Sequence, residues 1–304
     1  MKLGFVSAIL PEFNLEQLFQ FASTHDFETV ELMCWPIGKA ERRYAGITHI
    51  DVAKLDDGEV KRIKGLCKKY GVSISGLGYY PNPLVKDEKE ARVYLEHIKN
   101  VISAAKKLGI NQMNTFIGRD HTRSLADNWV LFDERWHEVI QHAQSQKVRV
   151  GIENCPMYFS QDEWPGGKNM AINPSIWREM FSRIRSPYFG LNYDPSHLVW
   201  QMIDPAKPLL EFKDKLFHVH AKDVRVDYDK LNRVGIMATP LEYHTPKLPG
   251  LGDVNWTAFF AALTEARYNG AVCIEVEDRA YEGSLEDRKR ALKQSARFLR
   301  NFVV

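Results

Sequence analysis

The sequence predicts a single-domain α/β protein folded as a (β/α)8 TIM barrel. Short apolar runs alternate with longer amphipathic stretches along the whole chain, which is the pattern of parallel strands joined by helical crossovers. Eight such apolar runs occur, and the chain lacks the glycine-rich turn of an open dinucleotide-binding sheet. The 304 residues suffice for one barrel of about 250 residues with insertions. We find no linker or low-complexity stretch that would divide residues 1–304 into two domains.

The predicted strands are short apolar runs bounded by polar or turn residues. They span Lys2–Ala8, Thr29–Met33, Val72–Tyr79, Gln112–Ile117, Arg149–Cys155, Tyr188–Tyr193, Leu216–Ala221 and Ala271–Val276. Parallel neighbours need a crossover connection, so the stretches between these runs are expected to be helical.

The clearest helix is predicted over Glu88–Leu108, and Gly109 follows it as a stop signal. Its apolar residues recur at spacings of three and four, at Leu95, Ile98, Ile102, Ala105 and Leu108. A last helix is predicted to start near Ser284. Its apolar face carries Leu285, Leu292, Ala296, Leu299 and Val303.

Two connections are longer than a minimal barrel requires. Residues 156–171, after the fifth strand, are rich in Gly, Pro, Asp and Trp. Residues 223–253, after the seventh strand, contain Arg225, Arg233 and His244. Both connections leave the C-terminal face of the barrel, where active sites of this fold lie, and long ordered loops are usually functional. We therefore expect both to cover an active site.

Composition excludes several classes of protein. Forty-one basic and 39 acidic residues give a formal charge of +2, and the signs are interspersed, which excludes a typical nucleic-acid-binding protein. No apolar run approaches the ~18 residues of a membrane span. The first residues lack the pattern of a signal peptide. The four cysteines are far apart and are expected to be reduced structural thiols, so we expect a cytoplasmic protein.

Charged residues stand at the ends of the last four predicted strands. They are Glu153, Asp194, His220 and Glu275. A charged side chain in a buried strand is costly unless it is paired or binds a metal. Each of these residues alone could be a helix cap, a salt-bridge partner or a core histidine. Because parallel strands end at one rim, the four together are better explained by one shared metal ion.

Three carboxylates and one imidazole suit Mn²⁺, Mg²⁺ or Co²⁺ better than a thiolate-based structural zinc. A metal that holds adjacent hydroxyl and carbonyl oxygens acidifies the C–H between them and stabilises an enediolate. Glu153 and Glu275 would then act both as ligands and as acid/base groups. His218 and Glu277 are interpreted as residues behind or beside this centre. Glu31 is either a support of the centre or a salt-bridge partner.

Four motifs resemble the sugar phosphate isomerase/epimerase family of xylose isomerase-like TIM barrels, which includes D-tagatose 3-epimerase-like enzymes and inosose dehydratases. The motifs are G-I-E-N at 151–154, D-P-S-H at 194–197, H-V-H-A-K-D at 218–223 and I-E-V-E-D at 274–278. The resemblance implies one divalent metal ion, Mn²⁺ first and Mg²⁺, Co²⁺ or Zn²⁺ as alternatives. Its implied ligands are Glu153, Asp194, His220 and Glu275. Glu153 and Glu275 would transfer protons, and His197 would bind a substrate oxygen.

The chain departs from ketose 3-epimerases at two points. Those enzymes have a second glutamate soon after the strand-five glutamate, whereas Cys155–Phe159 carries no carboxylate. Their substrate-binding arginine after strand seven has an approximate counterpart in Arg225, with Lys222 nearby. These departures weaken the prediction of a free-ketose substrate and leave the predicted metal centre intact.

The superfamily also contains endonuclease IV-type nucleases, which use three zinc ions and additional histidines. At the corresponding strand ends this chain has Glu31, Tyr79, Tyr80 and Asn114. Only one metal site is fully supplied, and the near-neutral charge also disfavours a nuclease.

Aromatic residues near the predicted rim suggest either ordinary packing or an apolar wall against a sugar ring or aromatic aglycone. They are Trp35, Tyr79, Tyr80, Phe116, Tyr158, Trp164 and Trp200. Such residues are also compatible with a homo-oligomer or a partner subunit.

The sequence therefore predicts a metal-dependent isomerase or epimerase of a small carbohydrate or polyol ketone, with neither a nucleic acid nor a membrane as partner. The alternative is a dehydratase or lyase of a keto-sugar, like inosose dehydratase or the enzymes that cleave 3-oxo-glycosides. In that case Arg225, Arg233 or His244 would protonate the leaving group. A third interpretation is a non-enzymatic barrel that binds carbohydrate or serves as a subunit.

Overall fold

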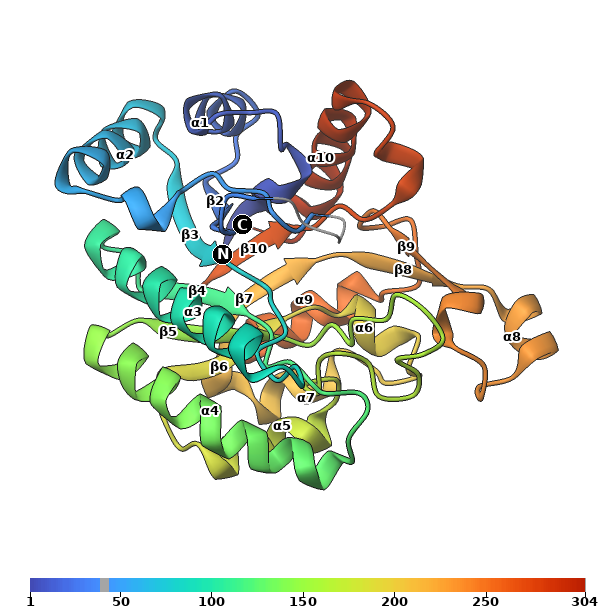
Figure 1. Ribbon diagram of the computed structural model, residues 1–304. Coiled ribbons are helices and arrows are strands. Elements are labelled where there is room, and N and C mark those ends of the chain that lie inside the picture. The colour runs from blue at the N-terminus through green and yellow to red at the C-terminus, as the bar shows by residue number, and fades with distance from the viewer. Residues whose placement is uncertain (39–43, 304) are drawn as a thin grey trace.

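The computed structural model describes residues 1–38 and 44–303. Eight parallel strands close into a barrel in the order β1-β10-β7-β6-β5-β4-β3-β2, with helices around it (Figure 1). The strands are β1 Lys2–Val6, β2 Thr29–Met33, β3 Ser73–Gly78, β4 Gln112–Thr115, β5 Arg149–Glu153, β6 Phe189–Tyr193, β7 Leu216–Ala221 and β10 Ala271–Ile274. The predicted (β/α)8 fold is confirmed.

The strand ends differ from the sequence prediction by one or two residues at most positions. β1 stops at Val6 because Ser7–Ile9 turns into the 3-10 helix η1. β4 and β5 stop two residues before their predicted ends, at Thr115 and Glu153. Glu153 is therefore the last residue of β5, Asp194 and Glu275 directly follow β6 and β10, and His220 is the second-last residue of β7.

The helices surround the barrel (Figure 1). They are α1 Leu15–Thr24, α2 Asp57–Tyr70, α3 Glu88–Leu108, α4 Leu125–Gln146, α5 Pro174–Arg183, α6 Ser196–Val199, α7 Lys207–Glu211, α8 Tyr228–Val234, α9 Trp256–Glu265 and α10 Leu285–Leu299; further 3-10 helices are η2 Val52–Lys54, η3 Lys213–Lys215, η4 Pro240–Glu242 and η5 Arg279–Tyr281. α3 has the predicted bounds, and Gly109 adopts the left-handed conformation (φ 78°) that ends it. α10 begins after its N-cap Ser284 and ends before Val303.

The largest apolar core lies between the strands and the helices. Trp136 of α4 stacks against Phe189 of β6, with ring centroids 6.1 Å apart. Trp177 of α5 meets Tyr193 edge to face at 5.6 Å. Burying one such side chain contributes about 1.5–3 kcal/mol, so this layer fixes the helices on the barrel and keeps the strand ends in register.

Residues 223–253, which the sequence predicts as a loop, contain two strands and two short helices. β8 Asp223–Val226 pairs antiparallel with β9 His244–Lys247, and α8 and η4 connect them. We call 223–247 the hairpin; it extends beside the barrel in Figure 1. The carboxylate of Asp223 anchors its base, because it accepts hydrogen bonds from four N–H groups. The donors are the main-chain N of Val224, Gly250 and Val254 and the indole N of Trp256.

The other long connection, 154–173, has no helix or strand. Asn169 ties it to the barrel: its Oδ1 accepts hydrogen bonds from Ile117 N and Gly118 N, at 3.1 and 3.2 Å. Its Nδ2 donates to the carbonyls of Glu153 and Cys155, at 2.9 and 2.7 Å. Across residues 1–38 and 44–303, no helix is long and apolar enough to cross a membrane.

Candidate metal centre

The four predicted ligands stand at the C-terminal ends of four neighbouring strands, and three of them, Glu153, His220 and Glu275, form a group of donor atoms that could hold one ion. Glu153 ends β5, Asp194 follows β6, His220 lies in β7 and Glu275 follows β10. His220 Nδ1 is 3.6 Å from Glu153 Oε1 and 3.6 Å from Glu275 Oε2. One donor atom from each of these three residues lies within 4.8 Å of the others. Asp194 and His220 are fully buried, whereas the Glu275 side chain is 20% exposed.

Asp194 has one oxygen held by its own turn and one turned toward the cluster. Ser196 N and Oγ donate to Asp194 Oδ1, at 2.8 and 2.7 Å. Oδ2 lies 3.1 Å from Lys222 Nζ and 3.4 Å from His197 Nε2. The Asn154 side chain binds both the N–H and the carbonyl of Asp194, each at 2.8 Å. This bracing joins the ends of β5 and β6.

The donor set fits a divalent cation. Asp194 Oδ2 is buried against the Lys222 ammonium at 3.1 Å, whereas His220 Nδ1 is buried and makes no hydrogen bond within the described part of the chain. A buried polar atom left in this way costs roughly 1–3 kcal/mol. Carboxylate oxygens and one imidazole nitrogen are the ligands of a hard or borderline divalent ion, which would satisfy these atoms.

Glu31 of β2 holds the far side of the His220 ring. Its Oε2 lies 2.7 Å from His220 Nε2, and Tyr80 Oη donates to its Oε1 at 2.5 Å. A Cβ at Gly78 would come within 2.7 Å of Glu31 Oε1, so this glycine leaves room for the carboxylate. With Nε2 directed at Glu31, Nδ1 faces Glu153 and Glu275. Burial opposes a charge on this ring, but Glu31, Glu275 and Glu153 raise the pKa of His220 well above its usual range. Of the two interpretations of Glu31, the structure therefore favours a support of the centre.

A further polar layer lies beneath this pair. His218 Nδ1 is 2.9 Å from Asn192 Oδ1, and its Nε2 is 3.1 Å from Ser75 Oγ. Asn192 Nδ2 lies 3.0 Å from His220 Nε2. Burial lowers the pKa of His218 to about 4, so this ring is neutral near pH 7. His218 is thus a residue below the centre, as the sequence predicted.

Lys222 places an ammonium group among the carboxylates. Its Nζ lies 2.7 Å from Glu275 Oε2, 2.9 Å from Glu277 Oε2 and 3.1 Å from Asp194 Oδ2. Burial opposes its charge, but the surrounding carboxylates raise the pKa of Lys222 well above its usual range. It is therefore a permanent cation of the site.

The two glutamates have opposite pKa shifts. Burial, together with the charge of Glu275, raises the pKa of Glu153 to about 7. Burial acts on Glu275 in the same direction, but Lys222 and His220 outweigh it and lower the pKa of Glu275 below its usual range. One carboxyl can thus carry a proton near neutral pH while the other stays ionised.

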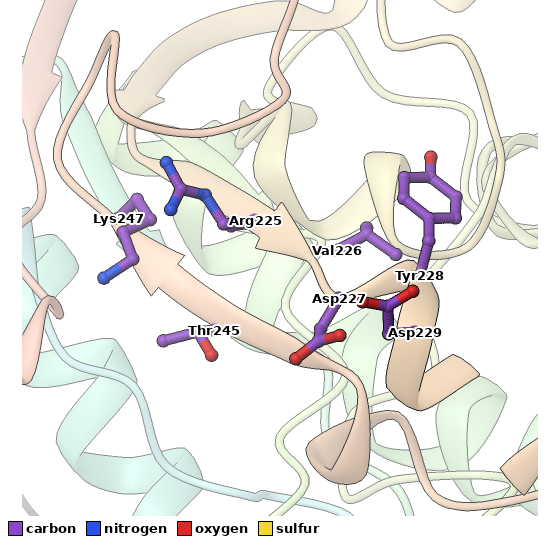
Figure 2. A pocket seen from close by; sticks show the side chains of 7 residues that line it. All are labelled: Arg225, Val226, Asp227, Tyr228, Asp229, Thr245 and Lys247. Atoms are coloured by element: carbon purple, nitrogen blue, oxygen red, sulfur yellow. The ribbon is translucent and has the colours of Figure 1, made fainter. Parts of the chain in front are cut away.

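The four predicted substrate-binding residues lie in two places. His197 and Lys222 belong to the cluster: His197 Nε2 is buried and lies 3.8 Å from Glu153 Oε1. Arg225 is exposed on β8 and donates to the carbonyl of Leu251 at 3.1 Å. Figure 2 shows it beside an open pocket of ≈ 470 Å³ that the hairpin forms. His244 stacks on Trp200 with centroids 5.1 Å apart.

The aromatic residues separate into three groups. Tyr79 packs against Trp35 and His97, in the layer outside the barrel. Tyr80 and Phe116 belong to a smaller buried cluster that we call the apolar wall. It comprises Val6, Ala8, Met33, Tyr80, Phe116, Met157 and Cys273. Tyr158 contacts Trp164 and Trp200, and Trp164 Nε1 donates to the carbonyl of Met237 at 3.0 Å. That hydrogen bond joins the loop after β5 to the hairpin.

Cys155 is a site residue that the sequence does not reveal, because its four cysteines all read as structural thiols. Donor atoms of Glu153, Cys155 and His197 lie within 4.8 Å of one another. The available signal is spacing: residues two apart at the end of a strand point to the same side, so Cys155 follows Glu153 into the barrel mouth.

Comparisons with known proteins agree with this architecture. A family model described as "Xylose isomerase-like TIM barrel" matches residues 19–302. "Uncharacterized protein YfiH" of Bacillus subtilis (strain 168) is 25% identical over 323 residues, which cover 97% of this chain and 99% of that protein. An "Inosose dehydratase" of Clostridium tetani (strain Massachusetts / E88) is 33% identical over 106 residues, only 34% of this chain and 36% of that protein.

Two solved structures show the same fold over nearly the whole chain. The probable 3-DHS dehydratase AsbF of Bacillus anthracis has a TM-score of 0.73 at 15% identity and covers 99% of both chains. The D-psicose 3-epimerase of Clostridium cellulolyticum H10, solved with D-tagatose, has a TM-score of 0.68 at 14% identity, covering 100% of this chain and 99% of that one.

Proposed function

The chain belongs to the xylose isomerase-like TIM barrel family, and from that premise we propose that it is a divalent-metal-dependent isomerase or epimerase of a small carbohydrate or polyol ketone. The reaction would begin with removal of a proton next to a carbonyl group. The observation that carries this proposal is the placement of Glu153 and Glu275, from different strands, each 3.6 Å from His220 Nδ1.

Glu153, Asp194, His220 and Glu275 would hold the metal, for which we propose Mn²⁺. A divalent cation supplies a Lewis acid that polarises the carbonyl and stabilises the negative charge of the enediolate. Three carboxylates and one imidazole, which would give up its Nδ1 proton when the ion binds, favour a hard or borderline ion. Glu31 would keep the imidazole in the tautomer that presents Nδ1.

The opposite pKa shifts of the two glutamates support a division of labour. Glu275 is ionised beside Lys222 and would accept the proton from carbon. Glu153, whose pKa is raised to about 7, would return a proton to the same carbon or its neighbour. Inversion of configuration at one carbon needs a proton removed from one face and returned to the other, and two proton-transfer groups from separate strands would supply this.

The remaining residues would hold the substrate. We propose that His197 and Lys222, which touch the ligand carboxylates, bind substrate oxygens near the reacting carbon. Arg225 and His244 lie on the hairpin and would contact the outer part of the substrate. The apolar wall would border the face of the sugar ring.

The test combines substrate screening with two substitutions. Ketoses and 3-keto-sugars are incubated with the Mn²⁺-loaded protein in D₂O, and the products are followed by NMR and mass spectrometry. Exchange of deuterium next to the carbonyl, with an isomeric product, is the expected result. E153Q and E275Q should each lower turnover about 10²–10⁴-fold, whereas E96Q on the exposed face of α3 should not. Full activity and metal content in either site variant would refute the mechanism.

A dehydratase or lyase is the second candidate, favoured by the local match to an inosose dehydratase. It would share the proton abstraction by Glu275. A cation such as Lys222, Arg225 or Arg233, or the His244 ring as a hydrogen-bond donor, would then assist the departing oxygen. Mass spectrometry separates the candidates, because elimination gives a product lighter by water or by an aglycone.

A further inference from the structure

We propose that Glu153, Cys155 and His197 form a second cation position, selective for zinc-type ions, that shares Glu153 with the predicted metal centre. The carboxylate, thiol and imidazole donors come from two adjacent strand ends, after β5 and after β6. One donor atom of each lies within 4.8 Å of the other two. Zinc ligands at about 2.0–2.3 Å from the ion would need only a small contraction of this triangle.

The backbone that presents these donors is held firmly. Asn169 Nδ2 donates to the carbonyls of both Glu153 and Cys155, at 2.9 and 2.7 Å. Asn154, between them, is tied to Asp194 on the neighbouring strand end. The donors therefore do not depend on a free loop, and ordering them for a cation costs little conformational entropy.

His197 supplies the observation that points to a ligand. The residue is only 9% exposed, and its Nε2 makes no hydrogen bond in the part of the chain that the structure describes. That nitrogen lies in the same triangle as the thiol and the Glu153 carboxylate. The nitrogen lies 3.4 Å from Asp194 Oδ2 and 3.8 Å from Glu153 Oε1, and a cation bound beside these carboxylates would give it the partner that a buried polar atom requires.

The two positions differ in chemistry. The predicted centre offers carboxylates and an imidazole, which suit hard and borderline ions. The second position replaces one carboxylate by a thiol, and thiolate with imidazole and carboxylate is a zinc ligand set. The thiol proton is released to solvent when the ion binds. Three protein donors leave a fourth position for water or a substrate atom.

This arrangement has a consequence that depends on the proposed function. An ion in the second position occupies Glu153 and His197, which the reaction would need for proton transfer and substrate binding. Excess Zn²⁺ would therefore inhibit an enzyme that a harder ion activates. The cation position itself does not depend on what reaction the protein catalyses.

Cobalt substitution tests the position directly. Co²⁺ bound by thiolate gives a charge-transfer absorption in the near ultraviolet that carboxylate and imidazole ligands do not give. The wild-type chain should show this band on titration, C155S should lack it, and C67S, altered on the outer helix α2, should retain it. Absence of the band from the wild type, or its persistence in C155S, would overturn the proposal.

A second variant and the number of zinc ions bound per chain complete the test. H197Q keeps the thiol and should lower the affinity of the thiolate-bound Co²⁺ at least about tenfold. Zinc bound after gel filtration should fall from about two ions per chain in the wild type to about one in C155S. Equal zinc content in the two proteins would contradict the second position. A cysteine-dependent band in a protein without turnover would refute the proposed function alone, and turnover without the band would refute the cation position alone.

Discussion

One half of the barrel mouth consists of charged side chains and the other half of apolar side chains. The ends of β5, β6, β7 and β10 bring together the carboxylates, the histidine and the ammonium of Lys222. The apolar wall draws most of its members from β1 to β4 and the residues just after them. Charges in the first half are tolerated because each one faces an opposite charge or a cation ligand set. The members of the wall are at most 8% exposed, and charges beside such an apolar surface interact more strongly than charges in water.

The contrast suggests that the two halves of the barrel mouth have different roles. The charged half would bind the ion and move protons. The apolar half would exclude water and give the substrate a surface to lie on. Tyr80 connects the halves, because its ring packs against Phe116 at 5.0 Å while its hydroxyl donates to Glu31. Substitutions in the two halves should therefore have separable effects.

Removal of the metal should have the largest effect on turnover, because the proposed ligands all belong to the charged half. Dialysis against a chelator should abolish turnover, and Mn²⁺ should restore it. At a metal concentration 100-fold above Kd, binding should also stabilise the fold by about 2.7 kcal/mol. Activity and thermal unfolding with and without metal measure both effects. Unchanged turnover in protein shown to be metal-free would contradict the proposal that the charged half acts through a bound metal ion.

Phe116→Ala should have the next largest effect, on stability instead of metal affinity. The ring is 6% exposed and packed in the wall, so its loss should cost about 3 kcal/mol of unfolding free energy. Denaturant unfolding and calorimetric metal titration report the two quantities. Phe116→Leu, which keeps most of the volume, is the control. A fall in metal affinity equal to that of a ligand variant would show that the halves are not independent.

Glu31→Gln should weaken metal binding by about 10- to 100-fold, because the amide is a weaker partner for His220 Nε2 than the carboxylate. Calorimetry gives the affinity, and ¹⁵N chemical shifts of His220 report which ring nitrogen carries the proton. Ser75→Ala, which removes a hydroxyl that contacts His218 Nε2 and Cys273 Sγ, should change the affinity less than about threefold. Wild-type affinity and an unchanged tautomer in E31Q would show that Glu31 is merely a packed ion-pair partner.

Arg225→Ala should have the smallest effect. The side chain is exposed and lies on the hairpin, so we expect an increase in KM of less than about tenfold and an unchanged kcat. Steady-state kinetics with the identified substrate measure it, and R233A serves as a comparison on the same hairpin. A large loss of kcat in R225A would mean that the hairpin takes part in the chemistry.

The sequence is informative where the signal is local. A charge at the end of an apolar run is visible in one dimension, so the amino-acid sequence alone selects Glu153, Asp194, His220 and Glu275. Contacts across the barrel are not local. Glu31 and His220 are 189 residues apart, and only the closed sheet places them 2.7 Å from each other. The role of Glu31 therefore depends on barrel closure, which no local pattern of residues encodes.

The exact ends of strands and the strands of the hairpin are also hard to predict from the sequence. Tyr79 and Tyr80 are adjacent, yet one packs outside the barrel and the other lies in the apolar wall. A one-residue uncertainty at a strand end exchanges such neighbours. β9, His244–Lys247, contains a proline and two basic residues, so it lacks the apolar alternation by which a strand is recognised.

The hydrogen bond between Trp164 and Met237 depends on the amino acid at only one of its two positions. The donor is an indole side chain, whereas the acceptor is a main-chain carbonyl that every amino acid possesses. Position 237, which is 81% exposed, is thus free to drift through many residue types without losing the link. Position 164 is constrained, because its side chain must supply a donor long enough to reach this carbonyl. Tyr158 of the same loop also packs against the cluster of Trp200, Val224, Val226 and Tyr243, so natural variants that lose the indole should weaken the connection of the two long segments without removing it.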